Sequence, residues 1–246
     1  MALTTLPPSA RVPGVEIEPG DSLPYLELNQ PPDIEHLVTE DDSPVDNIFS
    51  AKQQRLLVSS LYDSWSPSRP FLADANVGLF YTPRQPPVVP DAFLSLDVQV
   101  GPEWWEKRNR SYFFWELGKP PEVAVEIVSN AEGGEDTEKL VHYAGMGVLF
   151  YVIYDPLQEL SRRKLSIYRL GERGYRRQTG PHFFPEVGLG MTLWEGVYQD
   201  MNMTWLRWCD AESRVLPTGA ERAEQERQRA ERLVAQLRAL GIEPEA

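Results

Sequence analysis

Two acidic residues and one lysine occupy positions from which they could hold a divalent cation. Asp91 follows a proline at the start of a strand-like segment, and Glu126 lies inside the next clear strand, among apolar neighbours. A carboxylate inside a buried strand is unfavourable unless it is paired or binds a cation. Two carboxylates on neighbouring strands offer the hard oxygen ligands that Mg²⁺ prefers. Lys139, in the following helix, could orient a water molecule or neutralise charge on a phosphate.

Each of these residues also has an ordinary structural explanation. A Glu-x-Val sequence in a strand, as at Glu126, is common by chance. Asp91 after a proline is often a hydrogen-bonding residue at a strand start, and Lys139 alone is typical of a solvated helix face. The pairing of Asp91 with Glu126 is what favours a metal site over these explanations.

The elements that would position these residues follow from the residue pattern. Apolar residues recur at helical spacing in 51–61, and the prolines in 66–70 end that helix. Segment 122–129 alternates like a strand, and segment 149–155 is continuously apolar, like a strand in the middle of a covered sheet. The intervening helix makes a crossover unit. The other predictions are a strand at 71–81, a break at 82–90, a strand at 91–100, an ordered loop at 101–121, a helix at 136–145 and a hairpin formed by 164–170 and 175–179.

Three stretches of the sequence together resemble one family of nucleases. These are VVPDAFLSLD, PPEVAVEIVSN and EKLVHYAGMGVLFYVIYDP, which occur in the family's order and spacing. The chain resembles the endonucleases of the Uma-two type, within the PD-(D/E)XK superfamily, over roughly residues 50–195. This resemblance implies an α/β fold with a restriction-endonuclease-like mixed central sheet flanked by helices, to which this chain adds a long C-terminal helix.

The resemblance also implies a mechanism and its residues. Asp91, Glu126 and the backbone carbonyl of Ile127 would bind Mg²⁺ (or Mn²⁺), and Lys139 would complete the catalytic set. The usual position of the superfamily's lysine is Val128 here, whereas Lys139 begins a Lys-x-x-x-Tyr-x-x-x-Gly-Val pattern that matches the family completely. The implied activity is metal-dependent hydrolysis of phosphodiester bonds, with DNA as the partner.

The sequence departs from the family in several places. Family members often begin with a glutamate-rich strand pair, which the N-terminal arm does not resemble. A histidine is expected in the first helix, but Lys52 or Gln53 stands in its neighbourhood. An acidic residue is expected just before the helical lysine, and either Glu135 or Asp136 fits that role. These departures keep a second class of function open, a scaffold that binds nucleic acid or protein on a nuclease fold without cleaving.

Charge is distributed unevenly along the chain. The formal net charge is −13, which argues against a protein that coats nucleic acid nonspecifically. Residues 1–49 hold ten acidic residues against one arginine, a net charge of −9. We therefore predict an acidic, proline-rich N-terminal arm over 1–47. Residues 162–177 carry a net charge of +6 with two interleaved tyrosines, which indicates either phosphate and base contacts or a solvated edge hairpin.

The C-terminal residues carry the clearest local signal. Thr218 and Glu221 form a capping-box pattern, and a helix is predicted from there to about Leu240. Apolar and small residues recur along it every three or four positions, so the helix either docks on its own domain or forms a coiled-coil homodimer. We thus predict the arm 1–47, a restriction-endonuclease-like domain 48–212 and a C-terminal helix 213–246.

Two further features bear on location and on aromatic packing. The single cysteine, the absence of a secretory pattern at the N-terminus and the lack of a membrane-length apolar run predict a cytoplasmic protein with no membrane partner. An aromatic cluster in the predicted loop is either core packing or a recognition surface. Its members are Trp104, Trp105, Tyr112, Phe113, Phe114 and Trp115.

Overall fold

The structure is a computed structural model that describes residues 47–103, 105–129, 134–180 and 182–241. The chain divides into two units, Met1–Pro32 and Asp33–Ala246, and every described residue belongs to the second unit. The predicted N-terminal arm therefore lies outside the described residues, apart from its last residue. That residue, Asn47, caps the first helix by accepting a hydrogen bond from the backbone N–H of Ser50.

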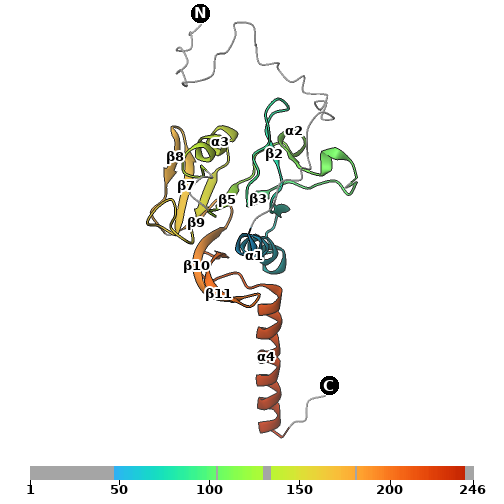
Figure 1. The fold of residues 1–246 in the computed structure, drawn as a ribbon. Coiled ribbons are helices and arrows are strands. Elements are labelled where there is room, and N and C mark those ends of the chain that lie inside the picture. The colour runs from blue at the N-terminus through green and yellow to red at the C-terminus, as the bar shows by residue number, and fades with distance from the viewer. Residues whose placement is uncertain (1–46, 104, 130–133, 181, 242–246) are drawn as a thin grey trace, which may run out of the picture. The chain divides into compact units, whose positions relative to one another are not determined.

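Figure 1 shows the order of the elements along the chain. The helices are α1 (Ile48–Ser64), the 3₁₀ helix η1 (Lys107–Asn109), α2 (Phe114–Leu117), α3 (Glu138–Met146) and α4 (Gly219–Ala239). The strands are β1 (Phe71–Asp74), β2 (Leu79–Phe80), β3 (Ala92–Leu96), β4 (Tyr112–Phe113), β5 (Val123–Ile127), β6 (Phe150–Tyr154), β7 (Leu165–Gly171), β8 (Gly174–Arg177), β9 (Phe183–Phe184), β10 (Leu189–Tyr198) and β11 (Met201–Cys209).

A six-stranded mixed sheet, in the order β1-β3-β5-β6-β7-β8, forms the centre of the fold. All neighbouring strands are antiparallel except β5 and β6, which are parallel and are joined through α3. The predicted crossover unit and the hairpin of β7 and β8 are therefore confirmed. The mixed sheet, its flanking helices and the long C-terminal helix confirm the predicted fold class.

Each face of the sheet carries its own apolar cluster. One cluster joins the sheet to α1 and to the strands β9, β10 and β11, with Leu57 and Trp208 among its fully buried members. The other joins the sheet to α3, β2 and β4 through residues such as Tyr143 and Tyr112. Alternate residues of β5 supply both clusters, because successive side chains of a strand point to opposite faces. Glu126 lies on the face that α3 covers.

Three predicted segments differ from the observed elements. The predicted strand 71–81 divides into β1 and β2, which belong to different sheets, with Asn76 at a φ of 55° between them. The predicted strand 91–100 ends at Leu96, because Asp97 has a φ of 59° and leaves the extended conformation. The predicted loop 101–121 contains η1, β4 and α2.

The aromatic cluster of this loop serves mainly as packing. Tyr112 and Phe113 are fully buried, whereas Trp105 is 59% exposed. Trp104 lies outside the described residues. A long antiparallel hairpin of β10 and β11, which was not predicted, follows further along the chain. Its inner residues include Trp205 and Trp208, which are fully buried and form part of the core.

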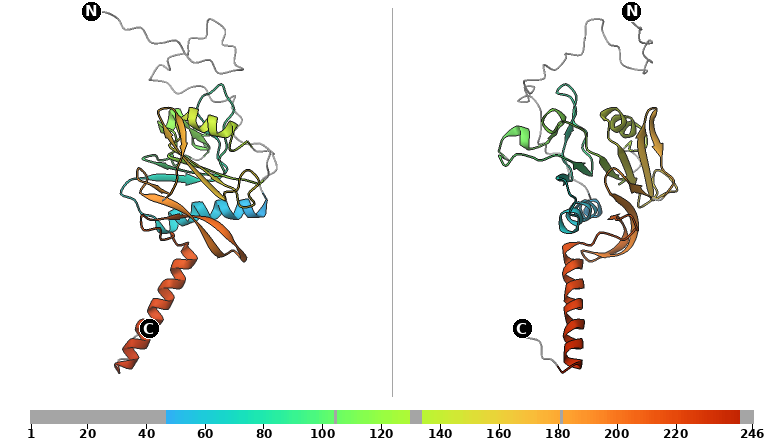
Figure 2. Two further views of the ribbon diagram at one scale, coloured as in Figure 1. Left: turned by 90° about the vertical axis from the view of Figure 1, so that its left-hand side faces the viewer. Right: turned by 180° about the vertical axis from the view of Figure 1, so that it is seen from behind.

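The C-terminal helix begins at the predicted capping box. Thr218 accepts a hydrogen bond from the N–H of Glu221, whose side chain accepts one from the N–H of Thr218. The first turn is attached to α1, because the N–H of Gly219 donates to Asp63 at 2.7 Å. No residue of α4 itself is buried, and Figure 2 shows the helix continuing beyond α1 and the β10–β11 hairpin. Within the described residues, no helix combines the length and apolar character needed to span a membrane.

Candidate metal centre

The register between β3 and β5 brings Asp91 and Glu126 to the same place on the sheet. Ala92 pairs with Val125, so Asp91, one residue earlier, lies across from Glu126, one residue later. The backbone confirms this proximity, because the N–H of Ile127 donates to Oδ2 of Asp91 at 2.6 Å. The two predicted carboxylates, 35 positions apart in the sequence, are thus neighbours in the fold.

The carboxylate of Asp91 is held by a second donor from α1. Nε2 of Gln54 donates to Oδ1 of Asp91 at 2.8 Å. Gln54 is itself oriented by Asn76, whose side-chain amide donates to Oε1 of Gln54 at 3.1 Å. The residue between β1 and β2 that has a positive φ therefore contributes to the support of Asp91.

Glu126 is buried, with 2% of its surface exposed, and both of its carboxylate oxygens accept hydrogen bonds from α3. Nζ of Lys139 donates to Oε2 at 2.9 Å, and the hydroxyl of Tyr143 donates to Oε1 at 2.6 Å. Lys139 and Tyr143 are four residues apart and so lie on one face of the helix. Nζ of Lys139 also lies 3.6 Å from Oε1 of Glu135, so the ammonium group links two carboxylates.

Burial and neighbouring charges shift the ionisation of this cluster. Burial raises the pKa of Glu126 to about 8, and the charge of Asp91 adds to this rise, although Lys139 and the hydrogen bond from Tyr143 oppose it. Burial is the largest single influence on Lys139 and lowers its pKa, but the charge and hydrogen bond of Glu126 together with the charges of Glu135 and Asp91 outweigh burial, so the pKa of Lys139 is raised. Burial, with the charge of Glu126, raises the pKa of Tyr143, so the phenol stays protonated as a donor. Strongly shifted groups of this kind are typical of functional sites.

The structure brings the predicted residues together and adds others to them. Asp91, Glu126 and Lys139 form one cluster, with the backbone of Ile127 at its edge. Val128, at the usual position of the superfamily's lysine, is buried in the apolar cluster beneath α3, and the ammonium group beside Glu126 comes from Lys139 of the helix.

Sequence reasoning missed Gln54, and it placed Tyr143 in the family's pattern without giving it a role in the site. Of the two residues considered in the first helix, Lys52 contacts the backbone of Gln199 and Gln53 hydrogen-bonds to Leu206, so neither contacts Asp91. The only hint of Gln54 in the sequence was a pair of consecutive glutamines in the first helix, both of which are buried in the structure. The spacing of four residues from Lys139 was the signal for Tyr143.

Burial decides between the two acidic residues that were considered just before the helical lysine. Glu135 is 6% exposed and contacts Lys139, whereas Asp136 is exposed. Oε2 of Glu135 is buried and has no hydrogen-bond partner among the residues that the structure describes. A buried carboxylate oxygen without a donor is costly unless a cation or water satisfies it.

The donor set suits a hard cation that keeps part of its water shell. Asp91 and Glu126 contribute carboxylate oxygens, and the orphaned oxygen of Glu135 belongs to the same lysine-linked cluster. In the described part of the chain, no group of three or more His, Cys, Asp or Glu side chains is placed to hold a metal ion. Mg²⁺ is usually bound through only one or two carboxylates together with substrate phosphates, so two acidic ligands fit it.

Comparisons with known proteins match the chain to one family model and to solved structures. Residues 25–196 match the model of a family named Uma2 and described as "Putative restriction endonuclease". This stretch begins inside the segment predicted as the arm and ends within β10. Among the solved structures that match is "a putative nuclease belonging to DUF820 from Anabaena variabilis", with 16% identity over 58% of this chain and 74% of that chain and a TM-score of 0.40. No curated protein matches the chain.

Proposed function

Because the chain belongs to the Uma2 family, whose description is "Putative restriction endonuclease", we propose that it is a metal-dependent endonuclease that hydrolyses phosphodiester bonds in DNA. One observation carries the proposal beyond family membership. Glu126 is a buried carboxylate that lies across from Asp91 and accepts a hydrogen bond from Lys139. This combination supplies both the ligands for a divalent cation and a positive charge beside them.

The residues of the chain take distinct roles in this proposal. Asp91, Glu126 and the carbonyl of Ile127 hold Mg²⁺ or Mn²⁺. When bound, the cation supplies a Lewis acid that polarises a phosphate oxygen and lowers the pKa of a water molecule. Lys139 orients that water and offsets negative charge that develops on the phosphate.

The supporting residues keep the ligands in place for this chemistry. Gln54 and the N–H of Ile127 hold Asp91 in a fixed orientation, and Tyr143 holds one oxygen of Glu126. Such hydrogen bonds around the ligands fix their geometry before substrate binds. Oε2 of Glu126 accepts a hydrogen bond from Lys139, which keeps the ammonium group beside the residues that would hold the cation.

Cleavage assays with site variants test this function. Supercoiled plasmid and single-stranded DNA would be incubated with Mg²⁺ or Mn²⁺ and the wild-type chain, Glu126→Ala or Lys139→Ala. Glu138→Ala is the matched control, because Glu138 is an exposed acidic residue of α3 next to Lys139. We expect metal-dependent cutting that both site variants lose and the control retains. A folded wild type that binds DNA without cutting it would instead favour the non-cleaving scaffold.

The C-terminal helix is the proposed site of self-association. Its first turn is attached to α1 through Asp63, but no residue of α4 is buried. The remaining surface of the helix, including the exposed Leu233, is therefore available to a second copy of the chain. We propose that residues 48–212 form the catalytic domain and that 213–246 join two such domains.

A further inference from the structure

The hairpin of β7 and β8 places like charges against each other. Arg169 and Arg176 are direct partners in the antiparallel pairing of these strands. Like charges directly opposite each other destabilise a strand pair. An anionic ligand at this position would offset that repulsion.

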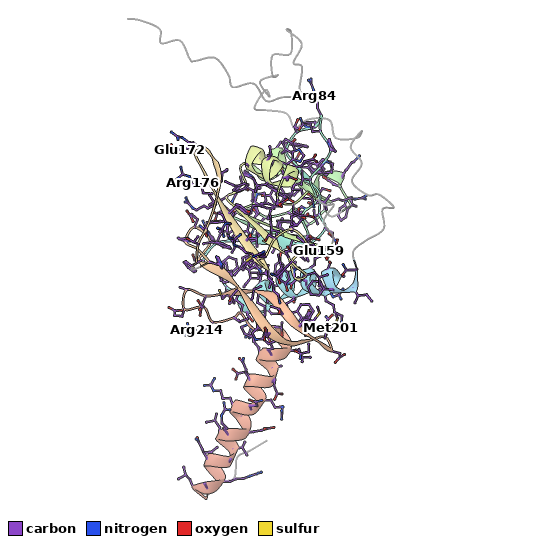
Figure 3. All side chains as sticks on the ribbon, turned by 60° about the vertical axis from the view of Figure 1, so that its left-hand side comes forward. Arg84, Glu159, Glu172, Arg176, Met201 and Arg214 are labelled. Atoms are coloured by element: carbon purple, nitrogen blue, oxygen red, sulfur yellow. The ribbon has the colours of Figure 1, made fainter. Side chains whose placement is uncertain are left out.

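The neighbouring arginines extend this positive surface. Arg173, Arg176 and Arg177 are exposed, and none of them forms an ion pair with another described residue. Together with Arg169 they line a concavity of about 580 Å³. Arg169 is the only one of the four with an ion-pair partner among the residues described, namely Glu186. Figure 3 shows Arg176 close to the end of the hairpin that carries Glu172.

Edge protection accounts for only part of this arrangement. A charged side chain on an edge strand prevents pairing with other sheets, and lysine is the usual choice. β8 is the edge strand, but Arg169 lies on β7, one strand inside it. Arginine instead presents a planar fork of donors that matches the oxygens of a phosphate.

The two tyrosines of the hairpin indicate whether it contacts the phosphate backbone or stacks on bases. Tyr168 and Tyr175 pack against the apolar cluster on the α3 face, and the hydroxyl of Tyr175 donates to the backbone carbonyl of Val148 at 2.7 Å. They are therefore not free to stack on bases. Arginines without accompanying aromatic platforms contact phosphates, which position a duplex but do not read its sequence.

One arginine of the hairpin, Arg177, shares a sheet face with the candidate metal centre. Arg177 pairs with Tyr168, Tyr168 with Tyr151, and Tyr151 with Ala124, which lies two residues before Glu126. Cross-strand partners share a face, so Arg177 and Glu126 belong to the same one. Three strand spacings separate β8 from β5, roughly 14 Å. Arg169 and Arg176 lie on the opposite face of the sheet, because they alternate with Tyr168 and Arg177 along their strands.

We propose that the arginines of the β7–β8 hairpin bind the phosphate backbone of duplex DNA. This inference deepens the proposed nuclease function and rests on it for the choice of ligand. The chain has a net charge of −13, so the duplex must approach through a local positive surface. The contact is independent of sequence and sensitive to salt.

The test measures binding without cutting. A fluorescently labelled DNA duplex would be titrated with the full chain in a buffer containing EDTA at several salt concentrations. The test variant is Arg173→Gln with Arg176→Gln. The control is Arg229→Gln with Arg232→Gln, two exposed arginines of α4 whose removal changes the net charge equally. We expect the test variant to bind at least about tenfold more weakly, with a salt dependence reduced by about two phosphate contacts. The control should match the wild type.

Several outcomes would overturn the proposal. Equal losses of DNA affinity in both variants would assign the effect to net charge. A wild type that does not bind the duplex would show that DNA is not the ligand of this surface. A hairpin that binds an acidic peptide but not DNA would assign the surface to a protein partner. Cleavage is assayed separately with metal, so cutting by a test variant that binds like the wild type defeats only this inference. A loss of binding without cutting by any variant defeats only the nuclease proposal.

Discussion

The hydroxyl of Tyr143 donates a hydrogen bond to Oε1 of Glu126 across 2.6 Å, deep beneath α3. Lys139, one turn earlier in the same helix, donates to the other oxygen of that carboxylate. One helix therefore supplies a donor to each oxygen of a buried acid. In the absence of a cation these two donors are what make the burial of Glu126 tolerable.

The raised pKa of Glu126 predicts how stability depends on pH. The pKa is about 8 in the folded protein and near the ordinary value of 4.5 in the unfolded chain, so the folded state holds the proton more tightly. This contribution is complete below about pH 4.5 and is lost as the pH rises through 8, by at most about 1.4 kcal/mol per pH unit. Denaturant unfolding without divalent metal should therefore show a wild type that loses stability over this range relative to Glu126→Gln. Glu159→Gln, which alters an exposed glutamate, should follow the wild type, and identical slopes in all three would contradict the prediction.

Metal binding should change with pH in the opposite direction. A cation requires the ionised form of Glu126, so the rise in melting temperature on adding Mg²⁺ or Mn²⁺ should be larger at pH 8.5 than at pH 6.5. Thermal unfolding at both values checks this, with Ca²⁺ and monovalent salt as references. Glu126→Ala should abolish the gain. A gain that survives in this variant would place the metal elsewhere.

Tyr143→Phe should weaken the site from within α3. The variant keeps the ring, which packs on Tyr151 with centroids 4.8 Å apart, but leaves Oε1 of Glu126 without this donor. We expect a loss of about 1–3 kcal/mol in the free energy of unfolding. The pKa of Glu126 should also rise further, which moves the metal-dependent gain to higher pH. Tyr198→Phe is the control, since among the described residues its hydroxyl accepts only a long hydrogen bond from Gln199. Equal losses would argue against a specific role for Tyr143.

Variants of Gln54 and Gln53 distinguish a residue that orients Asp91 from a residue that stabilises the core. Gln54→Ala removes the donor to Oδ1 of Asp91, so affinity for Mn²⁺ and cleavage should fall severalfold or more, as for other residues that orient metal ligands. Gln53→Ala removes the two hydrogen bonds to the backbone of Leu206 and should lower stability by about 1–3 kcal/mol while metal affinity stays the same. Metal titrations of the folded variants measure both. Equal effects on metal affinity would reject the positioning role of Gln54.

The proposed dimer can be tested on the seam of α4. Val234→Glu with Leu237→Glu adds two charges to the apolar seam and should convert a dimer into a monomer in sedimentation experiments. Gln225→Glu with Ala239→Glu adds the same charge on the opposite face of the helix and should leave the dimer intact. The melting temperature of the monomer should stay close to that of the wild type, because no residue of α4 is buried. A monomeric wild type at micromolar concentration would refute the prediction.

Local signals predicted the elements that carry the site. The alternation of 122–129, the helical lysine and the apolar strand after it correctly indicated β5, α3 and β6, and the capping box located the start of α4. Periodicity and capping depend on residues a few positions apart, so they can be read from the chain itself. The candidate set of Asp91, Glu126 and Lys139 came from these elements together with the family resemblance.

Long-range contacts decided the rest. The choice between neighbouring glutamines of α1 depends on partners 37 residues away for Gln54 and 153 residues away for Gln53, a distance over which periodicity carries no information. The division of 71–81 into two strands and the β10–β11 hairpin likewise arise from pairing and packing, not from local propensity. The pKa of Glu126 depends on complete burial beneath α3 and on the charges around it. The sequence by itself determined which residues could do the chemistry, and the tertiary structure decided which neighbours hold them, because only the folded chain brings those neighbours into contact.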